Sequence, residues 1–271
     1  MPHDPLAGTP LAGLADELDA LRAVVATIQA SAWDKPTRCE GWTVADVLLH
    51  LAQTNEFATA SLRDELGPRH AFASPAATGP PRAAGDDVDA AAAAAVEAQR
   101  HTTPAEILAR WERSAATMLD AFRARDLHDR VQWVAGTLSA RTLVSTRIAE
   151  TWIHAGDIST ALGIEQAPTS RLREIARLAW RTLPYALARA GYEASSEVCF
   201  ALTGPDGEPW SFGPIGSAVG VANPDSDLTV IRGPALDLCM VAARRLDPRA
   251  SSLRGSGPDT EAVLRHVRTY A

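Results

Sequence analysis

Apolar residues at helical spacing dominate the first 165 positions of the chain. In the first apolar segment the interval alternates between three and four residues, which places the side chains on one face of a helix. This stripe consists of Leu11, Leu14, Leu18, Leu21, Val25 and Ile28. A helix with one apolar face is stable only when that face is buried against another element. The segment therefore predicts a helix that packs against other helices.

Threonine residues mark the start of two further helices. Thr43 precedes an apolar segment and is followed three residues later by Asp46, which is typical of an N-cap. Thr103 is followed by Pro104 at the first helical position and by Glu106, which completes a capping box. Both sites predict a sharp helix start.

Together these signals predict four long helices before residue 165. They cover residues 11–28, about 44–66, 104 to about 122, and about 139–162, and Gly163 closes the last one. Residues 67–86 are rich in proline and predict a loop, and the alanine-rich run 90–95 predicts a short helix. Four amphipathic helices of this length are typical of an antiparallel four-helix bundle.

The pattern changes after about residue 165. A helix is predicted from Pro168 and Thr169 to about residue 190, and two more over about 233–245 and 259–270. Strands are predicted over 196–202, 210–212 and 227–231, the first two joined by a tight turn at 204–207. The predicted fold class is therefore α plus α+β, with a helical bundle at 1–165 and a smaller α+β domain at 166–271.

Composition limits the classes of partner. The chain carries 26 basic and 33 acidic residues, a net charge of −7, and no basic patch, which argues against nucleic acid or an anionic membrane as partner. No stretch approaches the roughly 20 apolar residues of a membrane span. Cys39, Cys199 and Cys239 form no CxxC pair. The first five residues have neither the basic start nor the apolar core of a signal sequence, so none is expected. We expect a cytoplasmic protein, monomeric or homodimeric, that acts on a small molecule.

Four ionisable side chains interrupt the apolar segment 142–162. Arg147, Glu150, His154 and Asp157 fall within an arc of roughly 80° when each residue turns the helix by about 100°. One interpretation is the wall of an active site. The other is the solvated face of a surface helix, with Arg147 and Glu150 as a weak ion pair. The stripe alone does not separate the two.

A metal site is the sharper hypothesis for this segment. Glu150 and His154 are four residues apart, so they lie one turn apart on the same helix face. His50, at the edge of the apolar stripe of the second helix, is the candidate third ligand, although a single histidine there is also typical of a hydrogen-bonded core residue. Two imidazoles and one carboxylate suit Zn²⁺ and leave one position open; Fe²⁺, Ni²⁺ and Mn²⁺ accept similar donors.

Two motifs resemble those of a known family. The run of residues 36–51, PTRCEGWTVADVLLHL, resembles the N-terminal motif of the mycothiol-dependent maleylpyruvate isomerase family, and residues 150–157, ETWIHAGD, resemble its second signature. The run 233–238 with Arg244 and Arg245 resembles the second, sterol-carrier-like domain of that family. The resemblance implies a DinB-like metal-binding four-helix bundle followed by a sterol-carrier-like domain.

The resemblance also implies a chemistry. It makes His50, Glu150 and His154 the metal triad, catalytic through the metal, with zinc the expected ion and mycothiol a possible co-substrate. Family members use the metal to activate the sulfur of a low-molecular-weight thiol, because coordination lowers the pKa of a thiol. The implied function is a thiol-dependent isomerase or S-transferase that acts on a small electrophile. The resemblance places a substrate-binding arginine in the second domain, where Arg244 or Arg245 is the candidate.

Other residues and functions remain open. Asp157 would orient His154, or be solvated, and Arg147 would bind a carboxylate or form a surface ion pair. Cys39 is either a nucleophile or supplementary ligand, or a small buried apolar residue. Trp42 and Trp152 are expected to pack around the site. The alternative functions are a thiol-independent Lewis-acid enzyme of specialised metabolism, catalysing cyclisation, lyase or hydrolysis chemistry, and a non-catalytic metal- or ligand-binding protein.

Overall fold

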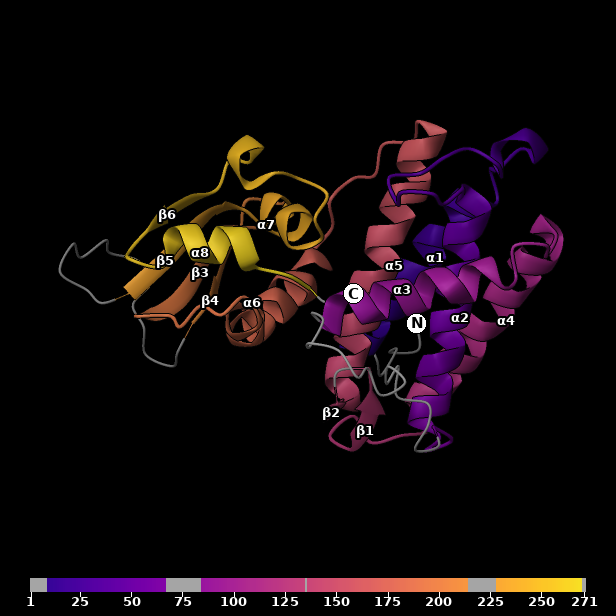
Figure 1. The fold of residues 1–271 in the computed structure, drawn as a ribbon, viewed down its shortest axis with the longest axis horizontal. Helices are drawn as coiled ribbons and strands as arrows, with labels where there is room; N and C mark the ends of the chain where they lie inside the picture. Colours follow the sequence, from indigo (N-terminus) through magenta and orange to yellow (C-terminus); the bar gives the residue numbers. More distant parts are fainter. Residues whose placement is uncertain (1–8, 67–83, 135, 214–227, 270–271) are drawn as a thin grey trace, which may run out of the picture. The chain divides into compact units, whose positions relative to one another are not determined.

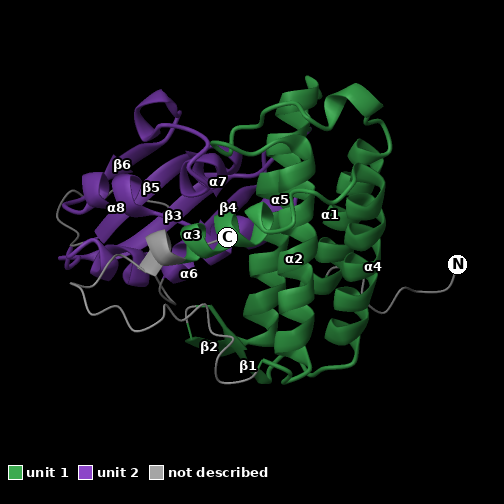
Figure 2. Cartoon of the chain, turned by 45° about the vertical axis from the view of Figure 1, so that its right-hand side comes forward, with its two compact units in different colours: residues 1–166 green, residues 167–271 purple. Residues whose placement is uncertain are grey.

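The computed structural model of the protein describes residues 9–66, 84–134, 136–213 and 228–269. The chain forms two compact units, residues 1–166 and 167–271, coloured green and purple in Figure 2. The first unit is helical and the second combines helices with a sheet, as the sequence predicts. Within the described ranges, none of the helices has the length and apolar character that crossing a membrane requires.

Four long helices build the first unit. They are α1 (Pro10–Val25), α2 (Val44–Leu62), α4 (Pro104–Arg123) and α5 (Ala140–Leu162). Helix α2 packs against α4 and α5, and α1 packs against α5. The shorter α3 (Ala84–Glu97) crosses the long helices (Figure 1). The predicted four-helix bundle is confirmed, and its core is formed by the apolar stripes that include Leu14, Leu18, Leu48, Trp111, Met118, Leu143 and Ile148.

The predicted helix starts are also confirmed. The Thr43 hydroxyl accepts from the Asp46 amide at 3.3 Å, and the Asp46 carboxylate accepts from the Thr43 amide at 2.9 Å. Thr103 and Glu106 form the same reciprocal pair before α4. At the other end of α5, Gly163 adopts a left-handed conformation with φ of +73°, which most other residues adopt only at a cost.

Several predicted bounds in the first unit are wrong. Helix α2 ends at Leu62 rather than about 66, where Asp64 takes a φ of +58° and binds Arg125 at 2.7 Å. Helix α1 ends at Val25 and leaves Ile28 outside it. Helix α3 begins at Ala84, inside the predicted loop, whose residues 67–83 lie outside the described part of the chain. The connection between α4 and α5 is an antiparallel hairpin, β1 (Arg130–Trp133) with β2 (Gly136–Ser139).

In the described part of the second unit, three α-helices pack with a four-stranded sheet. The strand order is β4-β3-β5-β6, with β3 parallel to β5 and the other pairs antiparallel. The strands are β3 (Glu197–Thr203), β4 (Pro209–Phe212), β5 (Leu228–Pro234) and β6 (Arg254–Ser256), and the helices are α6 (Leu172–Arg189), α7 (Ala235–Ala242) and α8 (Thr260–His266). The α+β class predicted for this part of the chain is confirmed.

The helices of the second unit are shorter than predicted. Gly233 and Pro234 end strand β5 instead of opening a helix, and α7 stops before Arg244, which has a φ of +62°. Helix α6 begins at Leu172, after Pro168 and Thr169, and α8 ends at His266. Strand β6 was not predicted, because its three residues are all exposed and carry no apolar alternation.

A buried aspartate links two segments of the second unit through hydrogen bonds. Asp259, at the start of α8, accepts five hydrogen bonds at 2.6–3.1 Å from the Tyr192 hydroxyl and from the amides and hydroxyls of Ser195 and Ser196. Its own amide donates to the Thr229 hydroxyl at 3.0 Å. Burial would raise the pKa of Asp259, but the hydrogen bonds outweigh burial and hold the pKa well below its ordinary value. Asp259 therefore joins α8 to the segment before β3.

The change Asp259→Asn should destabilise the second unit by about 3 kcal/mol, since it removes charged hydrogen bonds and leaves buried donors unsatisfied. Because the folded pKa is depressed, the carboxylate stabilises the wild type above the unfolded value of about 4, and this stabilisation is lost as the pH falls further. Thermal melts at pH 7 and pH 3 test this. The exposed Glu193→Gln serves as control, and equal melting of Asp259→Asn and wild type at pH 7 would contradict the assignment.

Candidate metal site

Helices α2 and α5 bring the three predicted metal ligands together. The Nε2 atom of His50 on α2 lies 2.8 Å from Oε1 of Glu150 on α5. The Nε2 atom of His154, one turn further along α5, lies 3.7 Å from the same oxygen. One ligand atom of each residue lies within 4.8 Å of the others. Because α2 packs directly on α5, residues 100 positions apart in the chain converge on one point.

The polar stripe on α5 is buried. The exposed fractions are 1% for Arg147, 5% for Glu150, 7% for His154 and 1% for Asp157. A solvated surface face is therefore not the explanation of the stripe. Burial of four ionisable groups on one helix requires partners for each of them, since an unpaired buried charge costs several kcal/mol.

Asp157 and Cys39 lie on the other side of the His154 ring. The Oδ2 atom of Asp157 lies 3.1 Å from Nδ1 of His154, and it accepts a hydrogen bond from the Cys39 thiol at 3.2 Å. The two ring nitrogens of His154 thus face different groups, Nδ1 toward Asp157 and Nε2 toward Glu150. The sequence motif contained Cys39, but only the fold shows that it reaches Asp157.

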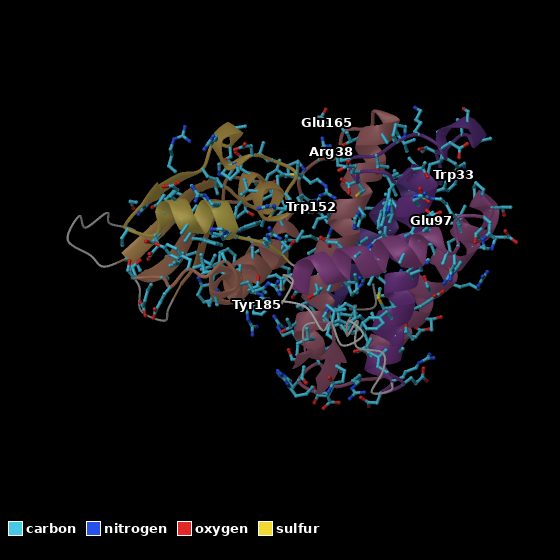
Figure 3. The ribbon with its side chains drawn as sticks, in the orientation of Figure 1. Trp33, Arg38, Glu97, Trp152, Glu165 and Tyr185 are labelled. Atoms are coloured by element: carbon cyan, nitrogen blue, oxygen red, sulfur yellow. The ribbon has the colours of Figure 1, made fainter. Side chains whose placement is uncertain are left out.

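Trp42 forms an aromatic wall beside the two histidines. Its ring centroid lies 4.9 Å from that of His50 and 6.4 Å from that of His154. The two imidazoles are 5.0 Å apart at an interplanar angle of 77°. Trp152 lies half-buried on α5 (Figure 3). Of the two tryptophans expected near the site, Trp42 is therefore placed against the histidines.

Burial and hydrogen bonds set the charges of the three candidate ligands. Burial would raise the pKa of Glu150, but the hydrogen bond with His50 and the nearby His154 and Arg147 hold it far below its ordinary value. Burial lowers the pKa of His50. Burial opposes protonation of His154 too, but Asp157, Cys39 and Glu150 outweigh it and raise the pKa to about 10. Without a metal, these shifts favour an ionised Glu150 and a positively charged His154 that is protonated on both ring nitrogens.

Arg147 is a buried cation one turn before Glu150. Its guanidinium donates to the Thr54 hydroxyl and to the side-chain oxygen Oδ1 of Asn55, both at 3.0 Å. Its Nε lacks a hydrogen-bond acceptor among the residues that the structure describes. Burial lowers the pKa of Arg147, and Glu150 opposes that effect. A buried guanidinium with an unused donor favours negative charge in its surroundings.

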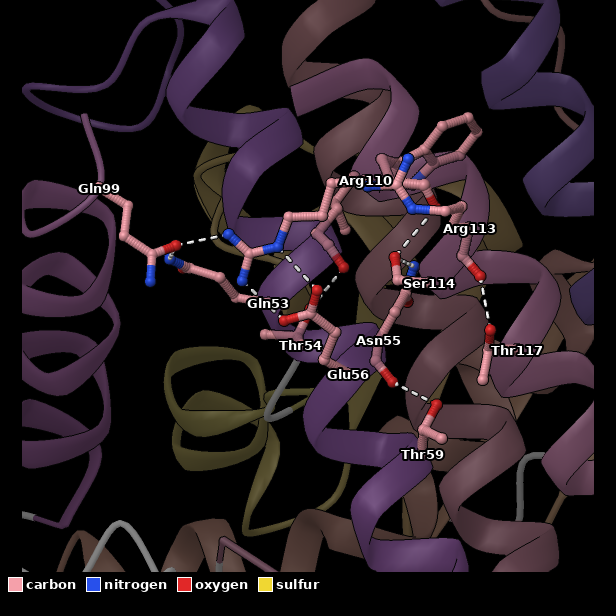
Figure 4. Close-up of polar contacts among 12 residues, drawn as sticks. Gln53, Thr54, Asn55, Glu56, Thr59, Gln99, Arg110, Arg113, Ser114 and Thr117 are labelled. Atoms are coloured by element: carbon pink, nitrogen blue, oxygen red, sulfur yellow. Dashed lines mark hydrogen bonds and ion pairs between the residues drawn. The ribbon is translucent and has the colours of Figure 1, made fainter. Parts of the chain in front are cut away.

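A polar layer between α2 and α4 supports Arg147. The Asn55 amide donates to the Ser114 hydroxyl at 3.4 Å, and the Thr59 hydroxyl donates to the Asn55 backbone carbonyl at 2.9 Å (Figure 4). Nearby, Arg110 binds both carboxylate oxygens of Glu56 at 2.7 Å. No sequence signal predicts this layer, because single Asn and Thr residues on a helix are ordinary.

The two other predicted substrate-binding residues lie in the second unit. Arg244 is exposed and donates to the backbone carbonyl of Arg265 at 3.3 Å. Arg245 donates to the backbone carbonyl of Ala243 at 3.1 Å. Arg244 thus contacts α8, and Arg245 contacts the residue that follows α7. Substrate binding by either arginine stays a prediction.

The donor set fits a divalent transition metal. Two imidazoles and one carboxylate are the ligands of many catalytic zinc sites, and three protein ligands leave a position open. The Nδ1 atom of His154 is hydrogen-bonded to the Asp157 carboxylate, and metal-bound histidines usually have such a partner on their other ring nitrogen. His50, Glu150 and His154 are the residues that would hold the ion. The fold and the site define a helical-bundle protein with a buried His₂Glu cluster.

Comparison with known proteins identifies the family. Residues 14–159, more than half of the chain, match the family model described as the mycothiol maleylpyruvate isomerase N-terminal domain. The chain belongs to this family. It is 31% identical over 262 residues to two uncharacterized proteins of Mycobacterium tuberculosis, one from strain H37Rv and one from strain CDC 1551. These alignments cover 96% of this chain and 95% of each relative.

Solved structures share the fold. The crystal structure of the mycothiol-dependent maleylpyruvate isomerase superposes on this chain with a TM-score of 0.58 at 18% identity. The superposition covers 91% of each chain. A histidine-to-alanine mutant of that enzyme superposes with a TM-score of 0.57 over the same share. At this identity the likeness establishes a common fold over both units.

Metal binding at pH 7 should release about one proton per chain. The raised pKa of His154 favours the imidazolium form, which must lose its Nε2 proton before that nitrogen can coordinate a metal. The apparent affinity should therefore rise roughly tenfold per pH unit between pH 6 and pH 8. Calorimetric titration of Zn²⁺ in buffers of different ionisation enthalpy measures the released protons. Binding without proton release over this range would contradict the charge assigned to His154.

Proposed function

We propose that this protein is a metal-dependent isomerase or S-transferase that uses a low-molecular-weight thiol of the mycothiol type on a small electrophilic substrate. The observation that carries the proposal is the buried convergence of His50, Glu150 and His154 in a member of this family. The solved relative is described as mycothiol-dependent, which supports a thiol as co-substrate here.

The protein side chains define how such a site works. A divalent metal, when bound, supplies a Lewis acid that lowers the pKa of a thiol. His50, Glu150 and His154 would hold the metal, and Asp157 orients His154 through Nδ1. Trp42 packs against the His50 ring. Burial of the ligands excludes competing solvent and strengthens electrostatic interactions within the site.

A thiolate accounts for both reaction types. In isomerisation the sulfur adds to an activated carbon–carbon double bond, the resulting single bond rotates, and expulsion of the sulfur restores the double bond. In transfer the new carbon–sulfur bond remains. Either the carbanion formed by addition takes up a proton from solvent, or the sulfur displaces a leaving group that departs with the bonding electron pair. Which of the two reactions occurs depends on the substrate, because the same metal-binding residues would serve both.

Arg147 supports an anionic partner for the site. It is a buried cation three residues from Glu150, and its Nε has no hydrogen-bond acceptor among the described residues. A positive charge held at low dielectric stabilises a nearby thiolate or substrate carboxylate. The proposed substrates are accordingly small electrophiles that carry a carboxylate.

The first test is elemental analysis and thiol binding. Purified wild type should contain about one divalent metal per chain, bind mycothiol saturably and convert maleylpyruvate or a related electrophile only with thiol present. His154→Ala and Glu150→Gln should lose the metal and the thiol binding. The exposed His101→Ala is the matched control and should retain both.

The outcomes separate the alternative functions. Metal with turnover but without thiol dependence would favour a Lewis-acid enzyme and contradict the thiol proposal. Metal or ligand binding without turnover across a panel of electrophiles would favour a non-catalytic binding protein. Wild type that takes up no divalent metal after reconstitution would overturn the metal site itself.

Arg147→Gln should weaken the binding of an anionic thiol or carboxylate ligand about tenfold or more, since it removes a buried positive charge near the site. Metal content should stay near that of wild type. Calorimetry of mycothiol binding to the metal-loaded variant measures the effect, with the exposed Arg113→Gln as control. Unchanged ligand affinity would show that Arg147 serves only to hold α2 against α5.

A further inference from the structure

We propose that Cys39 is a positioning residue of the metal site, which acts on His154 through Asp157. The inference rests on the proposed metal-binding function of His50, Glu150 and His154. It concerns a thiol that belongs to neither the triad nor the bundle core. Cys199 and Cys239 are buried in the second unit, whereas Cys39 is half-exposed beside the site.

The geometry places Cys39 at the end of a short chain of hydrogen bonds. Its thiol donates to Oδ2 of Asp157 at 3.2 Å, and the same oxygen lies 3.1 Å from Nδ1 of His154. The Cys39 sulfur lies 3.8 Å from that nitrogen. A single carboxylate oxygen thus receives donors from two elements, the loop before α2 and helix α5.

The orientation of His154 explains why this contact matters. A histidine that donates Nδ1–H to a carboxylate is held in the tautomer and ring orientation that leave Nε2 for a metal. Asp157 lies on the same helix, three residues after His154. The helical backbone allows more than one side-chain rotamer of Asp157, so a further contact is needed to select one. The Cys39 thiol is a contact from a separate element that favours the rotamer in which Oδ2 faces His154.

The loop that carries Cys39 is well held. The Cys39 amide donates to the Thr37 hydroxyl at 3.2 Å, and the Thr37 hydroxyl donates to the Trp42 carbonyl at 3.0 Å. Pro36 and Thr43 close the loop as an antiparallel bridge. The same loop therefore supplies Trp42 against His50 and Cys39 against Asp157, and it touches both histidines of the triad.

The close grouping of the Cys39, His154 and Asp157 ligand atoms suits direct ligation as well as hydrogen bonding. The two roles differ in what coordinates the ion. In the positioning role, Nε2 of His154 binds the metal and the sulfur stays outside the coordination sphere. In the ligand role, the thiolate binds the metal directly, which a cobalt-substituted protein reports by a sulfur-to-cobalt charge-transfer band.

The test compares Co²⁺ affinity and absorption spectra of the full-length wild type, Cys39→Ala and Cys39→Ser without substrate or thiol. Cys39→Ala should weaken Co²⁺ binding about tenfold, because the loss of residues that orient a metal ligand commonly has an effect of this size. Cys39→Ser keeps a donor and should restore most of the affinity. Cys199→Ala controls for the loss of a cysteine away from the site. No sulfur-to-cobalt band is expected in any of them.

A double-mutant cycle with Asp157→Asn shows whether Cys39 acts through Asp157. Once Asp157 is changed, Cys39→Ala should have little further effect on Co²⁺ affinity, because the contact it supports is gone. Additive effects, or equal affinity of Cys39→Ala and wild type, would overturn the inference while leaving the proposed function intact. A charge-transfer band lost in Cys39→Ala would overturn it in favour of direct ligation. A wild type that binds no metal would overturn both proposals.

Discussion

The burial of a charged stripe on α5 is the constraint on which the first unit depends. Arg147, Glu150, His154 and Asp157 lie along the face of α5 that a bundle helix would ordinarily fill with apolar side chains. Each buried charge costs several kcal/mol unless it is paired. The cost is offset by contacts from α2 and its preceding loop, so the packing of α2 on α5 and the chemistry of the site are one arrangement.

The pairing within this stripe is specific rather than generic. Glu150 and Asp157 flank the two sides of the His154 ring, and the raised pKa of His154 favours a second ring proton whose charge opposes that of Glu150. In the proposed metal-bound state a divalent cation replaces that proton. Arg147 adds one positive charge, and the acceptors it contacts within the described part of the chain are the neutral side chains of Thr54 and Asn55. This asymmetry is the physical basis for expecting an anionic co-substrate.

Most of the helical framework was predictable, because its signals are local. The threonine caps and Gly163 set helix ends through hydrogen bonds and backbone conformation within a few residues. Strand β6 was missed because its three residues are all exposed and carry no apolar alternation. The hairpin before α5 was missed because each of its strands has only four residues. The end of α2 was misplaced, since the contact of Asp64 with Arg125 forms only in the folded bundle.

By itself the sequence determined the bundle helices and the shared face of Glu150 and His154, because helical periodicity acts over one or two turns. It also named His50 as the third candidate. Only the tertiary structure decided that the stripe is buried and that His50 reaches Glu150 across the interface. The contact of Cys39 with Asp157 likewise spans 118 residues. Such contacts depend on how helices pack, and packing is set by the whole set of apolar faces rather than by any local run.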